Sequence, residues 1–165
     1  MLKLQAGLRL KKAKRRKGRS ETTRANMVKT FDMQFIRYMN LFGKITKVTA
    51  KHCFMYNNMI VFVVPRYFVE KAIGRNNENL KRLSGILSKR IRVVAEPRGR
   101  KDIGNFVFVL ITPIRYQSLE VKDDEIVIVA GRESKAMLIG RERARERELM
   151  GILEQYFGIK SVRIM

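Results

Sequence analysis

Two short segments of the chain combine an isoleucine, a glycine and an arginine in the same order, Ile73-Gly74-Arg75 and Ile139-Gly140-Arg141. The segments lie 66 residues apart, and each stands between an apolar, strand-like run and a stretch with the spacing of a helix. A glycine lets the backbone turn sharply and approach a ligand, and the helix that follows presents unpaired N–H groups at its first turn. With an arginine beside them, these groups predict two phosphate-binding turns.

The charge of the chain indicates a polyanionic partner. With 36 Lys and Arg against 15 Asp and Glu, the 165 residues have a formal net charge of +21 and a sequence pI near 10.8. Such an excess of cations favours nucleic acid, which binds cationic proteins by releasing the counterions of its phosphates. A hydrophobic content of 45% is enough for a folded core, so wholesale disorder is excluded.

Other classes of protein are excluded by features that the sequence lacks. No apolar run approaches the ~20 residues that cross a bilayer, and no secretory signal is visible, so we expect a soluble, cytoplasmic protein without membrane contact. Cys53 is the only cysteine and His52 the only histidine, which excludes an internal disulfide and a Cys/His metal site. No paired carboxylates, nucleophile–base set or Walker-type loop occurs, so we expect no enzyme, no cofactor and no small-molecule substrate.

The first 30 residues form a separate basic segment. They contain eleven Lys and Arg against Glu21 alone, which gives +10 of the net charge. Like charges repel and bury little apolar surface, so we expect an arm that is disordered unless bound and that adds affinity for RNA phosphates. A solubilising terminus is the alternative. The densest cations of the arm are Lys11, Lys12, Lys14, Arg15, Arg16, Lys17 and Arg19.

From residue 31 onward, the hydrophobic pattern predicts one order of elements twice. The first series is a helix from about 32 to 43, strands 47–56 and 59–64, a helix 67–73, a turn 74–77, a helix 78–88 and a strand 91–95. The second series is an element over 103–111 that fits a helix or a strand, strands 118–121 and 126–130, helices 133–139 and 141–157, and a strand 161–164. Between them, the short polar segment 97–101 predicts two halves that pack rigidly.

This order, with Ile-Gly between the paired helices, resembles a type II KH (K-homology) domain, and two such domains in tandem resemble archaeal NusA. The run Phe35-Ile36-Arg37-Tyr38-Met39-Asn40-Leu41-Phe42 and the pair Val64-Pro65 are also similar to that family. The resemblance covers about residues 31–165. It implies an α/β (α+β) fold of two tandem type II KH domains, 31–97 and 98–165, each a three-stranded sheet packed by helices, after the basic arm 1–30.

The resemblance implies an RNA-binding factor linked to RNA polymerase, which holds single-stranded RNA in transcription elongation, termination or antitermination. A ribosome-associated or ribosomal protein whose basic arm binds rRNA is the alternative. The implied RNA contacts are Ile73, Gly74, Arg75, Asn76, Asn77, Asn79, Lys81 and Arg82 in the first half, and Gly140, Arg141, Arg143 and Arg145 in the second. Leu80 would line the first groove beside Ile73.

The turns depart from the Gly-x-x-Gly pattern of KH domains at the second glycine. Asn77 stands there in the first half, and asparagine tolerates a left-handed backbone better than other side chains. Arg143 stands there in the second half, where its β-carbon restricts close approach and Glu142 adds charge that repels phosphate. We therefore expect the first turn to be the stronger RNA contact.

Two further groups of residues have both a structural and a functional interpretation. Opposite charges three apart predict the helix pairs Glu142–Arg145, Arg143–Glu146 and Arg145–Glu148, which suit a solvated helix or a protein-contact surface. Tyr67 and Phe68 are able to stack on bases, although their spacing predicts that one of the two belongs to the core.

Overall fold

The structure is a computed structural model that describes residues 33–165, so the basic arm predicted for residues 1–30 lies outside the described residues. A helix over residues 33–46 comes first. The elements that follow are β1 (His52–Tyr56), β2 (Met59–Val64), η1 (Arg66–Phe68), α2 (Val69–Ile73), η2 (Arg75–Asn77), α3 (Glu78–Leu87) and β3 (Arg90–Ala95). We call residues 38–95 the first repeat.

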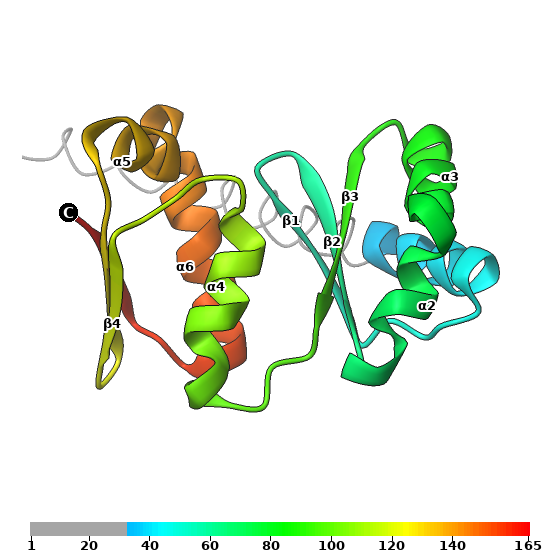
Figure 1. Cartoon of the computed structure of the whole chain (residues 1–165), viewed down its shortest axis with the longest axis horizontal. Coiled ribbons are helices and arrows are strands. Elements are labelled where there is room, and N and C mark those ends of the chain that lie inside the picture. The colour runs from blue at the N-terminus through cyan, green and yellow to red at the C-terminus, as the bar shows by residue number, and fades with distance from the viewer. Residues whose placement is uncertain (1–32) are drawn as a thin grey trace, which may run out of the picture. The chain divides into compact units, whose positions relative to one another are not determined.

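The second repeat, residues 100–164, has the same order (Figure 1). Its elements are η3 (Arg100–Asp102), α4 (Ile103–Ile111), β4 (Ser118–Lys122), β5 (Glu125–Val129), α5 (Arg132–Ile139), η4 (Arg141–Arg143), α6 (Ala144–Phe157) and β6 (Ser161–Ile164). Both repeats belong to one compact unit, residues 38–165. The predicted duplication is confirmed, and the ambiguous element over 103–111 is a helix.

Each repeat contains a three-stranded sheet in which the first two strands form an antiparallel hairpin. The third strand lies parallel to the second, at the other edge, giving the orders β1-β2-β3 and β4-β5-β6. Asn57 and Asn58 have φ angles of 49° and 55°, so they form the tight hairpin turn that the sequence predicts. The architecture is therefore α+β, with two sheets and their helices.

Three predicted boundaries are wrong because of backbone turns. The first helix continues to residue 46, where the Thr46 hydroxyl donates to the Phe42 carbonyl at 2.8 Å and accepts from the Val48 N–H at 3.1 Å. Lys47 has a φ angle of 57°, so β1 begins only at His52 and not at residue 47. Likewise, the last helix begins at Ala144 and not at 141, because the residues before it turn left-handed.

Strand β2 is buried along its whole length and contributes side chains to two hydrophobic cores. Ile60, Phe62 and Val64 point into one core with α2, α3 and the helix over residues 33–46, where Phe42 stacks on Phe62 at 4.3 Å between ring centroids. The alternate side chains, Met59, Val61 and Val63, point into the other core. Because both faces of such a strand are covered, its sequence is a continuous apolar run, as it is over residues 59–64.

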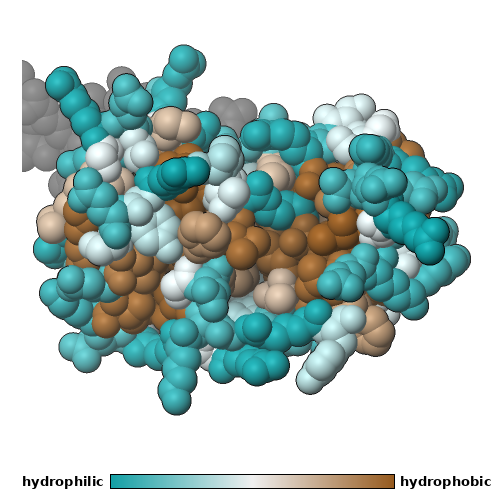
Figure 2. Space-filling model, in the orientation of Figure 1, coloured by the Kyte–Doolittle hydropathy of each residue, from teal (hydrophilic) through white to brown (hydrophobic). Residues whose placement is uncertain are grey.

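The second core joins the two repeats. It contains Met59 and Val61 of β2 together with buried residues of α4, α5, α6 and the second sheet. Figure 1 shows α4 and α6 on the face of the first sheet opposite α2 and α3. Apolar residues gather on the surface where α4 faces β3, and hydrophilic residues border them (Figure 2). Apolar burial of this kind is the main source of stability in a domain.

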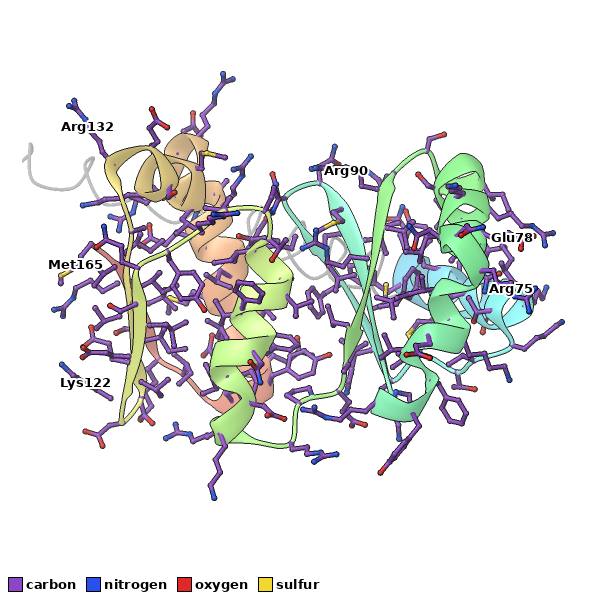
Figure 3. All side chains as sticks on the ribbon, in the orientation of Figure 1. Arg75, Glu78, Arg90, Lys122, Arg132 and Met165 are labelled. Carbon is purple, nitrogen blue, oxygen red and sulfur yellow. The ribbon has the colours of Figure 1, made fainter. Side chains whose placement is uncertain are left out.

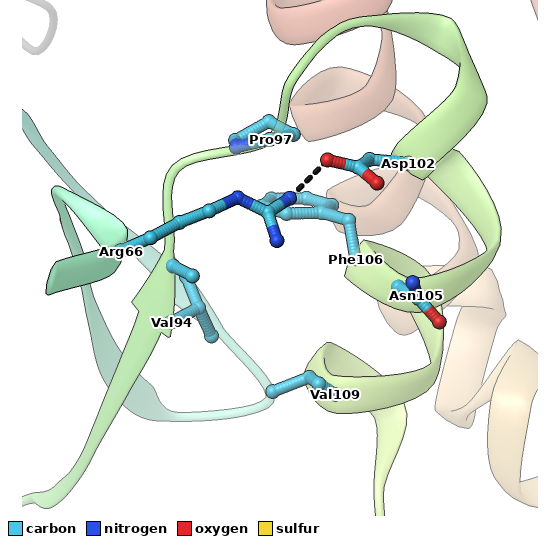
Figure 4. A pocket seen from close by; sticks show the side chains of 8 residues that line it. Arg66, Val94, Pro97, Asp102, Asn105, Phe106 and Val109 are labelled. Atoms are coloured by element: carbon cyan, nitrogen blue, oxygen red, sulfur yellow. Dashed lines mark hydrogen bonds and ion pairs between the residues drawn. The ribbon is translucent and has the colours of Figure 1, made fainter. Parts of the chain in front are cut away.

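Polar contacts also connect the repeats. The Arg66 guanidinium forms an ion pair with Asp102 across the pocket drawn in Figure 4, and Asp102 also accepts from the Arg98 backbone N–H at 2.7 Å. At the turn of the first hairpin, the Asn57 N–H donates to the Glu148 carboxylate at 2.8 Å. These bonds and the shared core position both Gly-led turns on one body.

Candidate nucleic-acid interface

The two Gly-led turns have the same backbone conformation. Gly74 has φ 77° and ψ 172°, and Gly140 has φ 72° and ψ 174°. The third and fourth residues of each turn are left-handed, with φ angles of 49° and 60° at Asn76 and Asn77. The corresponding angles in the second turn are 51° and 58°, the latter at Arg143. A side chain at the fourth position therefore does not prevent the turn, although left-handed residues other than glycine carry backbone strain.

A close contact behind each glycine holds the turn. A β-carbon added to Gly74 would lie 2.9 Å from the Asn79 amide nitrogen, and that nitrogen donates to the Lys71 carbonyl at 3.1 Å. In the second turn, an added β-carbon at Gly140 would lie 2.8 Å from the side chain of Arg145. The Arg145 guanidinium donates to the Met137 carbonyl at 2.7 Å. The structure thus places Asn79 and Arg145, both predicted RNA contacts, behind their turns.

The first turn presents three unpaired cations. Within residues 33–165, the side chains of Arg75, Lys81 and Arg82 make no hydrogen bond or ion pair, and all three are exposed. Together with Asn76 and Glu78, they line an open pocket of about 520 Å³. Figure 3 shows Arg75 and Glu78 at this end of the repeat, with their side chains directed outward. The predicted first-turn cations are therefore gathered and available to an anion.

One cation of the second turn is paired internally, whereas Arg141, at the position equivalent to Arg75, makes no side-chain hydrogen bond or ion pair within residues 33–165. The Arg143 guanidinium donates two bonds to the Glu146 carboxylate, at 2.7 and 2.9 Å, and this pairing lowers the pKa of Glu146. Arg147 donates to the Glu142 carbonyl at 3.0 Å. Of the three predicted helix pairs, only this Arg143–Glu146 pair forms. The other two predictions are wrong, because Arg145 bonds to a carbonyl and Glu148 bonds to the Asn57 N–H.

The apolar positions beside the two turns also differ. Ile73 and Leu80 are half-buried and pack against the first core. The position of Leu80 is occupied in the second repeat by Glu146, which is 8% exposed. Beside it, a pocket of about 410 Å³ is lined by Glu142, Arg143, Glu146, Arg147, Met150, Lys160, Ser161 and Val162. The apolar side chain beside the first turn is therefore replaced by a carboxylate beside the second.

Several of these functional candidates were missed by the sequence analysis. Glu146 was recognised only as a helix charge, although its spacing of three from Arg143 was the available signal. Lys160 lines the second pocket from the loop before β6, and no local pattern indicates this. The prediction that Tyr67 or Phe68 belongs to the core is wrong, because their side chains are 88% and 46% exposed.

Two other chemical groups of the described residues are a buried thiol and a carboxylate paired with cations. Burial raises the pKa of the Cys53 thiol to about 12, so the thiolate nucleophile is scarce at neutral pH. Asp124, in the β4–β5 turn, bonds to Arg100 at 2.8 Å and to Lys160 at 2.7 Å. Among residues 33–165, no three His, Cys, Asp or Glu side chains are grouped to hold a metal ion. No helix in this part of the chain is long and apolar enough to cross a membrane.

Comparisons with known proteins find similarity over most of the chain. No protein-family model matches it. A protein of Thermoplasma acidophilum described as a probable transcription termination protein NusA is 23% identical over 139 residues, which cover 82% of this chain and 94% of that protein. The crystal structure of APE1850 is 27% identical, with a TM-score of 0.57, and the match covers 81% of this chain and 99% of that chain. The structural match supports the α+β architecture described above.

Proposed function

We propose that this protein is an RNA-binding factor of the NusA type, in which two tandem type II KH domains, residues 31–97 and 98–165, hold single-stranded RNA. The support for the KH assignment is the repeated order of elements with a left-handed, Gly-led turn between the paired helices. The similarity to the Thermoplasma protein, whose name refers to transcription termination, supports the NusA type. Because KH domains bind the backbone of unpaired nucleotides, the ligand is single-stranded RNA.

The first turn carries this proposal. Its glycine allows the RNA backbone to approach, and Arg75, Lys81 and Arg82 are free to bind phosphates. Ile73 and Leu80 supply the apolar wall against which bases pack. Cations that are already exposed and unpaired need not break an internal ion pair before they bind, so more of their interaction with phosphate contributes to affinity.

The second turn has a weaker role in this proposal. An incoming phosphate would have to compete with Glu146 for Arg143, and the Glu142 carboxylate would repel it. Gly140, Arg141 and Arg143 then contact RNA only after the strand is held by the first turn. The protein acts in transcription elongation, termination or antitermination by holding the transcript near RNA polymerase, with no chemical step of its own.

A ribosome-associated protein is the second candidate, and the composition of residues 1–30 favours it. A segment with a net charge of +10 is suited to bind between rRNA helices by phosphate contacts. Crosslinking of RNA to the protein in a native lysate distinguishes the two. Nascent transcripts linked through residues 74–82 would support the NusA-type role. Fixed rRNA sites linked through the arm would contradict the NusA-type role and support the ribosome-associated one.

Fluorescence anisotropy with a labelled single-stranded RNA tests the RNA-binding proposal. Arg75→Asp should weaken binding by about tenfold or more, because a phosphate contact is replaced by repulsion. Arg132→Asp is the matched control, since Arg132 is an exposed cation at the start of α5 and the change in charge is the same (Figure 3). Equal losses in both variants would show that only net charge matters and would contradict a site at the first turn.

A further inference from the structure

Two exposed aromatic side chains lie in η1, seven and six residues before Gly74. Tyr67 is 88% exposed and Phe68 is 46% exposed, so neither is used by the core. The Lys71 ammonium lies 5.9 Å from the centroid of the Phe68 ring. Exposed aromatic rings beside cations are the elements from which proteins build stacking sites for unpaired bases.

Tyr67 borders a small pocket whose lining combines apolar rings with charged side chains. The pocket has a volume of about 210 Å³ and is lined by Pro65, Arg66, Tyr67, Glu96, Pro97 and Arg98. Small-molecule sites usually begin near 300 Å³, so this pocket suits one planar ring system rather than a complete ligand. Two proline rings and a tyrosine ring supply flat apolar surfaces for such a ring.

One of the three charged side chains of this pocket is held in an ion pair, and the other two are not. Arg66 is held by its ion pair with Asp102, which fixes the wall of the pocket. Within residues 33–165, the side chains of Glu96 and Arg98 make no hydrogen bond or ion pair. An unpaired carboxylate accepts hydrogen bonds from amino groups, and an unpaired guanidinium binds phosphate.

We propose that this pocket binds a single unpaired base of RNA that carries an exocyclic amino group. The base stacks on Tyr67, its amino group donates to Glu96, and Arg98 binds the adjacent phosphate. Cytosine presents such an amino donor, whereas uracil presents a carbonyl oxygen in its place. The proposal rests on the RNA-binding function proposed above and adds to it a second contact with a preference between bases.

The position of the pocket fits a strand that also occupies the first turn. Contacts run from Phe68 to Lys71 through the cation–π pair, and from the Lys71 carbonyl to Asn79 behind Gly74. Between the pocket and Gly74 lies α2, whose five residues span roughly 7 to 8 Å at a rise of about 1.5 Å per residue. A few nucleotides cover this distance, so one strand reaches both sites.

The test compares the affinity of the full chain for oligocytidine and oligouridine of equal length. We expect wild type to prefer oligocytidine, and Tyr67→Ala to weaken oligocytidine binding about 5- to 150-fold, the range for losing one stacked base. Tyr67→Phe should bind as wild type does, because the ring remains. Glu96→Gln should reduce the preference for oligocytidine. Phe108→Ala removes another exposed aromatic, on α4, and should leave both affinities unchanged.

The outcomes separate this inference from the proposed function. If wild type binds neither oligonucleotide, the RNA-binding function itself is contradicted. If wild type binds RNA but Tyr67→Ala and Glu96→Gln behave as wild type does, the pocket is overturned while the function stands. Equal losses in Tyr67→Ala and Phe108→Ala would also overturn it, because loss of any exposed aromatic would then suffice. Thermal unfolding of each variant verifies that the fold is retained.

Discussion

Asn79 and Arg145 occupy equivalent positions in the two repeats and make the same hydrogen bond, although the residues have different chemistry. Each side chain donates to the carbonyl eight residues earlier, that of Lys71 at 3.1 Å and that of Met137 at 2.7 Å. Each also fills the space behind the turn glycine. The duplication therefore preserves the geometry of the turn, while the residues that build it have changed.

Substitution of either turn glycine by alanine should destabilise the protein. In Gly74→Ala, the new β-carbon meets Asn79 and the backbone keeps a φ of 77°, so we expect a loss of about 1–3 kcal/mol in the free energy of unfolding. Gly85→Ala is the control, because that helical glycine has no atom within 4 Å of an added β-carbon and should gain about 0.5–1 kcal/mol. Urea unfolding measures both, and a destabilised Gly85→Ala or a neutral Gly74→Ala would contradict this account.

The ion pair between Arg66 and Asp102 should contribute to the packing of the two repeats. Asp102→Ala removes the partner of a partly buried guanidinium and the acceptor of the Arg98 N–H. We expect the free energy of unfolding to fall by about 1–3 kcal/mol. Glu154→Ala is a control, since that glutamate lies on α6, is exposed, and its side chain has no ion pair within residues 33–165. A similar loss in both variants would contradict a specific role for Asp102.

The Arg143–Glu146 pair should make stability depend on pH in the acidic range. Bonding to Arg143 lowers the pKa of Glu146 below its ordinary 4.5, so the unfolded state binds more protons than the folded state when the pH falls. The contribution of the pair is therefore fully present above about pH 4.5 and is lost as the pH falls through the lower, folded pKa.

We expect Glu146→Gln to be less stable than wild type at pH 7, and the difference to shrink toward pH 3. Urea unfolding followed by circular dichroism across this range measures it. Glu133→Gln is the control, because Glu133 is exposed at the start of α5 and its side chain makes no ion pair within residues 33–165. A difference between wild type and Glu146→Gln that stays constant with pH would exclude titration of the pair as its cause.

The dependence of RNA affinity on salt concentration should show how many phosphates the first turn contacts. For single-stranded RNA, each phosphate contact contributes about 0.7 to the slope of log affinity against log salt. Lys81→Gln should therefore weaken binding to all sequences and reduce the slope by about 0.7, whereas Lys135→Gln on α5 should leave it unchanged. An unchanged slope in Lys81→Gln would mean that Lys81 does not contact phosphate.

Local sequence patterns were sufficient for most of the fold. The alternation and the apolar runs predicted the strands over residues 59–64 and 161–164 with their observed bounds. Glycine at positions 74 and 140 predicted the turns, because the backbone conformation there is one that side chains disfavour. Errors occurred where a side chain redirected the backbone, as Thr46 does at the end of the first helix.

The sequence by itself determined the duplication, the position of both turns and the excess of positive charge, since these follow from residue type and spacing. Only the tertiary structure decided that β2 serves two cores, that Arg143 binds Glu146 while Arg75 stays unpaired, and that Tyr67 is exposed. The physical reason is that spacing reports the local geometry of the backbone. Burial and pairing depend on residues that are distant in the sequence, and packing alone brings these residues together.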